Sequence, residues 1–484
     1  MQGIFRKRGL TEIINLVCLI TGIFIIILLP LKKEIWYDET VSILISKGIS
    51  PDTKQLFADN TPVSSATLHQ FNTIPHVFEA TVSDNANSFI YNLALHWYTQ
   101  LCGNTIAGYM WFSKLIAIAT LIAFWFLCKL FFNNNIFTSV AILLLSTDID
   151  FVAMSHEIRA YAMGILFITL AAVNFYKFMY RAEKPVWLFL TGLFSVAAVL
   201  CHFLSVYVVV VFLVALIYNK GRALFATKNI IAIVMPVLMI AAYFLGTYSG
   251  LQTMSRQNHE IQERALAAGF SNLEVMSRAM KFTAVNLKLV FPSFMGSRQV
   301  IIMSFLLAVA LYGAGIKLAK DKEQKSTLHL LLALSAGSSI FLALLCAKSH
   351  HYTALYYRYF SFCLPFCCLF VAYLLYLFFT SPRIKNAIAS GIAVVIILPS
   401  VLLFVQWVKN TKPVQKYNFT DVAGIITASG YNKIEVPQWR DAFLINALLP
   451  DGYKIDYFRN PAATEFTVYK AEGITKIPVI RNDE

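Results

Sequence analysis

An acidic pair, Asp38 and Glu39, directly follows the first hydrophobic stretch of the chain, residues 13–31. That stretch has about the 20-residue length needed to cross a bilayer, and the basic segment 6–8 precedes it. The positive-inside rule therefore places the N-terminus in the cytoplasm and the acidic pair on the external face. A carboxylate at that boundary can accept a proton from a hydroxyl group. The sequence thus predicts a catalytic site outside the membrane.

Further polar residues recur at the ends of other hydrophobic stretches, on the same predicted side. Ionisable residues at the rim of a helix bundle are costly unless they face a cavity or one another. We therefore expect them to share one site with Asp38. They are Glu157, Arg159 and Tyr161 before the fourth stretch, His202 between the fifth and sixth, and Lys348, Arg358 and Tyr359 around the start of the tenth.

Composition identifies the class of protein. The 484 residues are 58% hydrophobic and only 14% charged, with a mean hydropathy of +0.64. This predicts an all-α polytopic membrane protein rather than a soluble one. The net charge of +14 comes largely from short loops between apolar stretches, so topology and anionic lipid headgroups explain it without nucleic acid. About eleven spans are expected, near 13–31, 106–131, 136–152, 160–180, 185–201, 203–218, 229–247, 299–317, 327–347, 356–380 and 387–405.

Two regions follow from this pattern. Residues 1–405 form the transmembrane domain, which carries an external loop at 32–105 with interfacial helices. Residues 406–484 are predicted to form a small α/β domain on the external (periplasmic) face. Its expected helices are 418–430 and 441–448, and its expected strands are 432–436, 453–457 and 464–470.

Each candidate residue also has a structural interpretation. Asp38 and Glu39 could be an acidic pair in the first turn of a helix, where the helix dipole stabilises them. Glu157 and Arg159 could be an ion pair at the rim, and His202 a buried structural histidine. Asp38, Glu157 and His202 could instead hold a divalent cation, so a metal cofactor is left open.

Several motifs in order resemble the membrane glycosyltransferases of the GT-C fold, and most closely the family of protein O-mannosyltransferases and lipid A aminoarabinose transferase (family 39-like). Trp36-Tyr37-Asp38-Glu39 resembles the family's acidic motif after the first span. Ser155 to Tyr161 is similar to its Ser-x-Glu-x-Arg-x-Tyr stretch. Leu93 to Trp97 resembles its interfacial helix, which here lacks the usual proline. Cys201-His202-Phe203 and Tyr357-Arg358-Tyr359 are similar to its later motifs.

The resemblance covers residues 10–405 and implies an inverting transferase that takes a sugar from a polyprenyl-phosphate carrier. Asp38 would be the base, with Glu39 and Glu157 beside it as catalytic carboxylates. The other polar residues would bind substrate and carrier phosphate: Arg159, Tyr161, His202, Lys348, Arg358 and Tyr359. A glycan, a glycolipid or a protein hydroxyl could be the acceptor. The implied location is the cell inner membrane.

Other classes remain open. A lipid-linked glycan transporter or flippase would place ionisable residues near the bilayer midplane and often shows inverted repeats. An O-antigen polymerase or ligase uses similar carriers but relies on a large later loop. A non-catalytic scaffold would use the tail for interactions. The clustering of polar residues at one face favours the glycosyltransferase.

Overall fold

The computed structural model describes most of the chain. The described residues are 2–29, 37–50, 63–64, 68, 70–132, 136–252, 255, 263, 277, 281, 283, 287, 298–348, 357–382, 384–410, 419–429, 433–436, 439–449, 455–459, 465–470 and 473–478. Trp36 and much of loop 32–105, including 51–62, lie outside them, as do the side chains of Tyr37 and Lys348.

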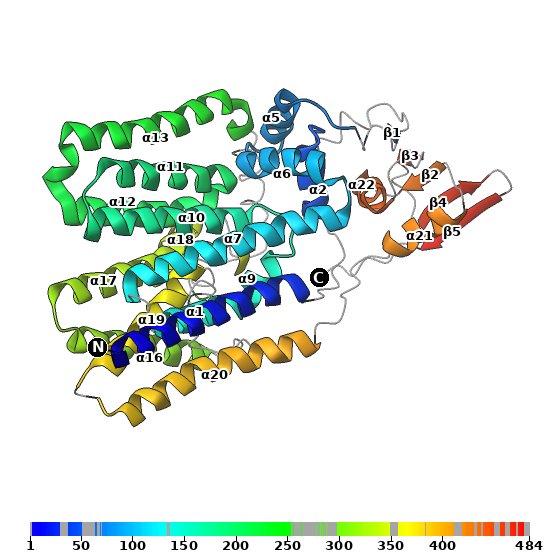
Figure 1. Cartoon of the computed structure of the whole chain (residues 1–484). Coiled ribbons are helices and arrows are strands. Elements are labelled where there is room, and N and C mark those ends of the chain that lie inside the picture. Colours follow the sequence, from blue (N-terminus) through cyan, green and yellow to red (C-terminus); the bar gives the residue numbers. More distant parts are fainter. Residues whose placement is uncertain are drawn as a thin grey trace.

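The membrane domain is a bundle of long helices that lie roughly side by side (Figure 1). Short 3-10 and π-helical segments, written η, join or extend them. The elements are α1 (Gln2–Leu28), α2 (Tyr37–Ser46), α5 (Ile74–Ser83), α6 (Phe89–Cys102), α7 (Ile106–Phe132), α8 (Ile136–Ser146), α9 (Ile149–Met154), α10 (Tyr161–Tyr176), η2 (Lys177–Arg181), α11 (Pro185–Cys201), η3 (Phe203–Ser205), α12 (Val206–Lys220), η4 (Gly221–Phe225), α13 (Thr227–Gly246), α16 (Arg298–Leu318), α17 (Lys322–Leu332), η6 (Ala333–Gly337), α18 (Ser338–Lys348), η8 (Tyr357–Cys363), α19 (Leu364–Thr380) and α20 (Asn386–Asn410).

Seven helices within the described residues are long and apolar enough to cross a membrane, and four shorter apolar helices accompany them. Each of the predicted spans coincides with a helix, so the polytopic all-α membrane domain is confirmed. The predicted span 136–152 is divided, because Asp148 caps a new short helix, α9, by accepting a hydrogen bond from the amide of Phe151 at 2.9 Å.

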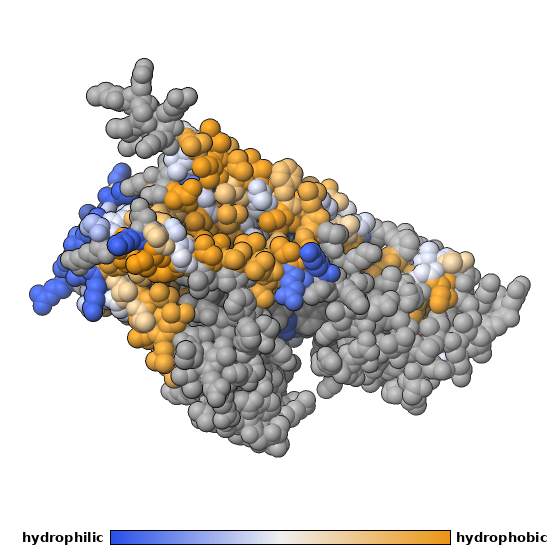
Figure 2. All heavy atoms as spheres, turned by 90° about the horizontal axis from the view of Figure 1, so that it is seen from below, coloured by the Kyte–Doolittle hydropathy of each residue, from blue (hydrophilic) through white to orange (hydrophobic). Residues whose placement is uncertain are grey.

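Burial separates the inner helices from the outer ones. In the span that contains α19, 89% of the most apolar 18-residue window is buried. In the α13 span, only 17% of the corresponding window is buried. The outer helices expose large apolar side chains such as Phe24, Val214 and Met235. In Figure 2, which views the molecule from below, hydrophobic residues form an orange band over the middle of the described surface, and hydrophilic residues gather mainly at one end. Such a band suits contact with lipid.

Basic loops meet at the end of the bundle where the chain begins (Figure 1). Lys220, at the end of α12, forms an ion pair with Glu183 at 2.5 Å and donates a hydrogen bond to the carbonyl of Met179 at 3.3 Å. Tyr180 lies within hydrogen-bond distance of Ser326, with 3.2 Å between the two hydroxyl oxygens. These contacts join the segment after α10 to the end of α12 and to the start of α17, at the end of the bundle that the sequence predicts to be cytoplasmic.

The opposite end carries α2, α5 and α6, and beyond them the small C-terminal domain (Figure 1). This domain packs α21 (Phe419–Ser429) and α22 (Trp439–Leu448) with β2 (Lys433–Val436), β3 (Asp456–Arg459), β4 (Glu465–Lys470) and β5 (Gly473–Pro478). The predicted α/β tail is therefore confirmed as a fold. The described sheet also contains β1 (Val63–Ser64), and its strand order is β1-β3-β2-β4-β5, with β2 and β3 parallel and the other pairs antiparallel.

The sheet takes its edge strand from the first loop. The strand β1 (Val63–Ser64) pairs with β3, so that Val63 lies opposite Tyr457 and Ser64 opposite Asp456. The buried side chains of the tail, including Tyr457, Phe466 and Ile434, join one hydrophobic cluster with residues of α2 and α6. The C-terminal domain is thus packed against the loop that carries the acidic pair.

Candidate functional site

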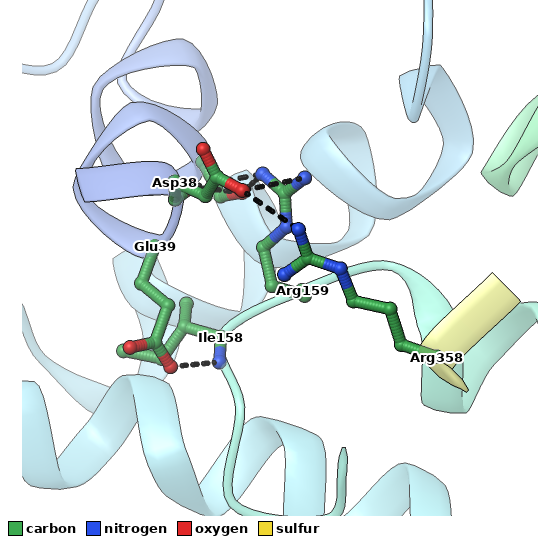
Figure 3. Close-up of polar contacts among 6 residues, drawn as sticks. Asp38, Glu39, Ile158, Arg159 and Arg358 are labelled. Atoms are coloured by element: carbon green, nitrogen blue, oxygen red, sulfur yellow. Dashed lines mark hydrogen bonds and ion pairs between the residues drawn. The ribbon is translucent and has the colours of Figure 1, made fainter. Parts of the chain in front are cut away.

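Two guanidinium groups converge on the carboxylate of Asp38 (Figure 3). Nη2 of Arg159 lies 3.6 Å, and Nη2 of Arg358 lies 3.7 Å, from the same oxygen, Oδ2 of Asp38. Both distances exceed the roughly 2.8 Å of a tight charge-assisted hydrogen bond. All three side chains retain solvent exposure, at 30% for Asp38, 19% for Arg159 and 15% for Arg358. The three charges therefore form a loose, accessible cluster.

Asp38 owes its position to the start of α2. Asp38 and Glu39 lie in the first turn of this helix, as the structural interpretation of the acidic pair also expects. Arg159 reaches the same turn from the other side, donating through Nη1 to the carbonyl of Asp38 at 2.9 Å and to the hydroxyl of Ser42 at 3.4 Å. The helix and the arginine therefore fix one another.

Glu39 points away from the arginines and into the protein (Figure 3). Its side chain is completely buried, and Oε1 accepts a hydrogen bond from the amide of Ile158 at 2.9 Å. The hydroxyl of Ser113 donates to the carbonyl of Glu157 at 2.6 Å. These two bonds hold the turn 155–160 between α2 and α7, so that Arg159 projects toward Asp38.

Arg358 comes from η8, more than 300 positions after Asp38 in the chain. A close approach between α10 and η8 places it. A Cβ at Gly164 would lie 2.6 Å from Cε1 of Phe362, a ring that is completely buried. The hydroxyl of Tyr207 also donates to the carbonyl of Tyr359 at 2.9 Å. The missing side chain at Gly164 therefore lets η8 pack close enough for Arg358 to reach Asp38.

Three aromatic side chains, Tyr161, His202 and Tyr359, lie beside the two arginines. The ring of Tyr161 lies 5.0 Å from His202 and 6.0 Å from Tyr359, and both guanidinium groups lie 5.8 Å from its centroid. Nδ1 of His202 accepts a hydrogen bond from the amide of Leu204 at 3.3 Å. Burial, with the nearby charges of Arg159 and Arg358, lowers the pKa of His202 to about 3. This histidine is therefore neutral at physiological pH and contributes no cation.

The remaining predicted residues lie at different depths. Glu157 is buried, with 8% of its surface exposed, and Arg159 pairs with Asp38 rather than with it. Lys348 ends α18, and its side chain lies outside the described residues. Within the described part of the chain, no three His, Cys, Asp or Glu side chains could hold a metal ion together. The structure thus does not assemble the ligand set of Asp38, Glu157 and His202.

Asp84 is a carboxyl group that the sequence pattern did not single out. It follows the last residue of α5, and its electrostatic neighbours are Arg159 and Asp38. The residue retains some solvent exposure, although most of its surroundings are protein. Burial raises the pKa of Asp84 to about 7, although Arg159 acts to lower it, and Asp38 adds a smaller increase. The only local signal was the polar run Asp84 to Ser88 before a helix.

The central part of the chain is similar to a known protein family. Residues 87–245, about a third of the sequence, match the family model of dolichyl-phosphate-mannose-protein mannosyltransferases. The match contains Arg159, Tyr161 and His202, and it confirms the resemblance to this family over that stretch. Together with the apolar helices, it supports a multi-pass membrane protein with a central stretch similar to this family. No curated protein sequence matches the chain.

Among solved structures, the fold is similar to that of the oligosaccharyltransferase of Archaeoglobus fulgidus in its apo form. The TM-score is 0.45 at 11% sequence identity, over 92% of this chain and 64% of that protein. The chain therefore spans a little less than two thirds of the length of that larger protein.

Proposed function

We propose that the protein is an inverting glycosyltransferase that moves a sugar from a polyprenyl-phosphate carrier to an acceptor hydroxyl on the external face of the inner membrane. The observation that carries this proposal is the pair of guanidinium groups, from Arg159 and Arg358, beside the accessible carboxylate of Asp38. Guanidinium groups bind phosphate oxygens in bidentate fashion, and a carboxylate can accept the proton of a hydroxyl. Both requirements of the reaction are met within one cluster.

In the proposed reaction, Asp38 accepts a proton and the two arginines stabilise the leaving phosphate. The acceptor oxygen attacks the anomeric carbon, and the bond from that carbon to the phosphate oxygen breaks, with its electron pair passing to the phosphate. The proton of the hydroxyl passes to the carboxylate of Asp38. Arg159 and Arg358 stabilise the charge that develops on the departing phosphate. Tyr161, His202 and Tyr359 would bind substrate beside them, and Lys348 remains a proposed phosphate ligand.

Binding of the carrier would also release Asp38. In the free protein both arginines lie nearest to the same oxygen of the Asp38 carboxylate. A phosphate that attracts the guanidinium groups would compete with this carboxylate for them. We therefore expect the donor to bind before the acceptor is deprotonated.

The proposed orientation follows from the distribution of basic residues. The loops that carry Lys177, Lys220 and Lys320 lie at the end of the bundle with the N-terminus, and the Asp38 cluster lies at the other end (Figure 1). The positive-inside rule assigns the basic end to the cytoplasm. This polarity supports an acceptor on the external face and disfavours a transporter, whose charges would line the bilayer midplane.

Transfer from a panel of radiolabelled polyprenyl-phosphate sugars, with membrane extract as acceptor, tests the proposal. The wild type should transfer label from one donor, and Asp38→Asn should lose at least about 100-fold of that rate, as expected for the loss of a general base. Asp321→Asn is the matched control, because Asp321 is an exposed helix cap far from the site and asparagine caps equally well. Near-normal turnover by Asp38→Asn would remove Asp38 from this role.

A further inference from the structure

The turn before α10 contacts both ends of the segment that joins α1 to α2. Nε2 of His156 lies 3.2 Å from the carbonyl oxygen of Leu29, which directly follows the last residue of α1. At the other end of that segment, Arg159 donates to the carbonyl of Asp38 at 2.9 Å. One short turn therefore holds the chain where it leaves α1 and again where it enters α2.

The end of α1 needs hydrogen-bond donors from other elements. The last four carbonyl groups of an α-helix have no amide partner within the helix, and a basic side chain near that end is favourable. The last turn of α1 contains no basic residue of its own. Nζ of Lys114 in α7 donates to the carbonyl of Ile27 at 3.1 Å, and His156 faces the carbonyl of Leu29. The two side chains thus cap α1 from outside the helix.

The two ring nitrogens of His156 make different contacts. The side chain is buried, with 2% of the residue exposed. Nδ1 lies 2.9 Å from the hydroxyl oxygen of Ser155 and 3.0 Å from the carbonyl oxygen of Val152, both within its own turn or the helix before it. Because the carbonyl of Leu29 can only accept, Nε2 must carry a hydrogen to bond it. Nδ1 therefore holds the ring locally, and Nε2 reaches across to α1.

The turn that carries His156 is itself fixed, so it can support α1. The amide of Ile158 donates to Glu39 of α2 at 2.9 Å, and the hydroxyl of Ser113 in α7 donates to the carbonyl of Glu157 at 2.6 Å. A simpler interpretation is that His156 only stabilises this turn, for which its contacts through Nδ1 would suffice. The contact through Nε2 instead joins the turn to the end of α1.

We propose that His156 is a positioning residue for the base of the proposed reaction. Through Nε2 it fixes the end of α1 against the turn that carries Arg159, and it thereby keeps Asp38 in place relative to that arginine. The effect is indirect, because the ring bonds the chain that leads to Asp38. A displacement of about 1 Å in a catalytic group can lower a rate about 100-fold. The inference rests on the proposed function, since it concerns the same carboxylate.

Glutamine and asparagine separate the roles of the two ring nitrogens. The amide nitrogen of glutamine reaches about as far as Nε2 of histidine, and that of asparagine about as far as Nδ1. His156→Gln therefore keeps a donor for Leu29, whereas His156→Asn keeps only the local contact. In the transfer assay, kcat of His156→Asn should fall at least about tenfold, with the donor KM within about twofold of the wild type. His156→Gln should keep kcat within about threefold, and the exposed control His76→Gln should match the wild type.

Hydrogen exchange, measured by mass spectrometry on the purified full chain, reads the same contact without a substrate. The amide of Leu29 bonds the carbonyl of Ile25 at 3.2 Å, so exchange there reports the end of α1. Peptides from the end of α1 and from α2 should exchange at least about tenfold faster in His156→Asn but not in His156→Gln. If His156→Asn does not fold, Lys114→Met removes the other donor to α1 and should lower kcat in the same way, with recovery in Lys114→Arg.

The outcomes separate this inference from the proposed function. A lower kcat and faster exchange in His156→Asn, both restored in His156→Gln, support the positioning role. Equal losses in the two variants, a loss in His156→Gln alone, or faster exchange with a normal kcat overturn it, while transfer by the wild type leaves the proposed function in place. No transfer by the wild type from any donor overturns the proposed function and the positioning of its base, even where exchange shows the contact to α1.

Discussion

At the scale of single residues, the site separates charges that a sequence motif presents together. Asp38 and Glu39 are neighbours, yet one faces two arginines and solvent, and the other is buried against the amide of Ile158. Successive residues of a helix point in directions about 100° apart, so adjacent carboxylates serve different surroundings. The adjacent pair therefore combines an accessible carboxylate with a structural anchor.

Arg358→Lys should raise the KM for the lipid-linked donor about 10- to 100-fold with a smaller effect on the KM for the acceptor. Lysine keeps the charge but loses the planar pair of donors, and a hydrogen bond to a charged group contributes about 1.5–3 kcal/mol. Steady-state kinetics with varied donor measures the change. Arg222→Lys, in the exposed η4 segment, is the control and should match the wild type. An unchanged donor KM in Arg358→Lys would argue against phosphate contact.

His202 should make the folded protein sensitive to acid. Its pKa is about 3 in the folded protein and near 6.5 once unfolded, so below pH 6.5 only the unfolded state gains the proton. This contribution is complete above pH 6.5, and stability should fall by about 2 kcal/mol by pH 5.

Thermal unfolding in detergent at pH 7 and pH 5 measures this loss. His202→Asn should show a smaller drop in Tm, because Oδ1 of asparagine can replace Nδ1 as acceptor for Leu204 without titrating. His76→Asn, at an exposed position, should behave as the wild type. Equal drops in all three proteins would show that His202 titrates normally.

At the scale of elements, the close packing of α10 against η8 at Gly164 allows Arg358 to reach Asp38. Gly164→Ala would place a methyl group against the buried ring of Phe362 and displace η8. We expect at least about a tenfold loss of kcat/KM with the protein still folded, and partial recovery in the double variant with Phe362→Leu. Gly391→Ala, where a Cβ meets no atom within 4 Å, should be neutral. Full activity in Gly164→Ala would mean that η8 tolerates the shift.

The sequence predicted the positions of helices and strands far better than the contacts between distant segments. Apolar length located the spans, and alternation located the helices and most strands of the tail, because both depend on neighbouring residues. The strands β1 and β5 were not predicted, since β1 is only two residues long and pairs with residues almost 400 positions away. Asp84 was missed for a related reason, because the burial that raises its pKa depends on tertiary packing and not on any local motif.

At the scale of the whole molecule, the pairing of β1 with β3 connects the first loop to the C-terminal domain. Val63→Cys with Tyr457→Cys should form a disulfide on mild oxidation in intact membranes, because these positions lie opposite each other in the antiparallel ladder. The background is Cys102→Ser, which removes an exposed thiol. Electrophoresis after protease cleavage between the two regions detects the bond. Val63→Cys with Lys476→Cys, on the far side of the sheet, should not crosslink.

The distribution of these partners along the chain also has a consequence for biogenesis. Asp38 is synthesised early, Arg159 after a further third of the membrane domain, and Arg358 and β3 only near the end. A nascent chain that has inserted only its first helices thus has the acidic residue without the second arginine, and β1 without a strand to pair with. We therefore expect the proposed site to be complete only late in synthesis, so that partial chains in the membrane would lack one of its two arginines.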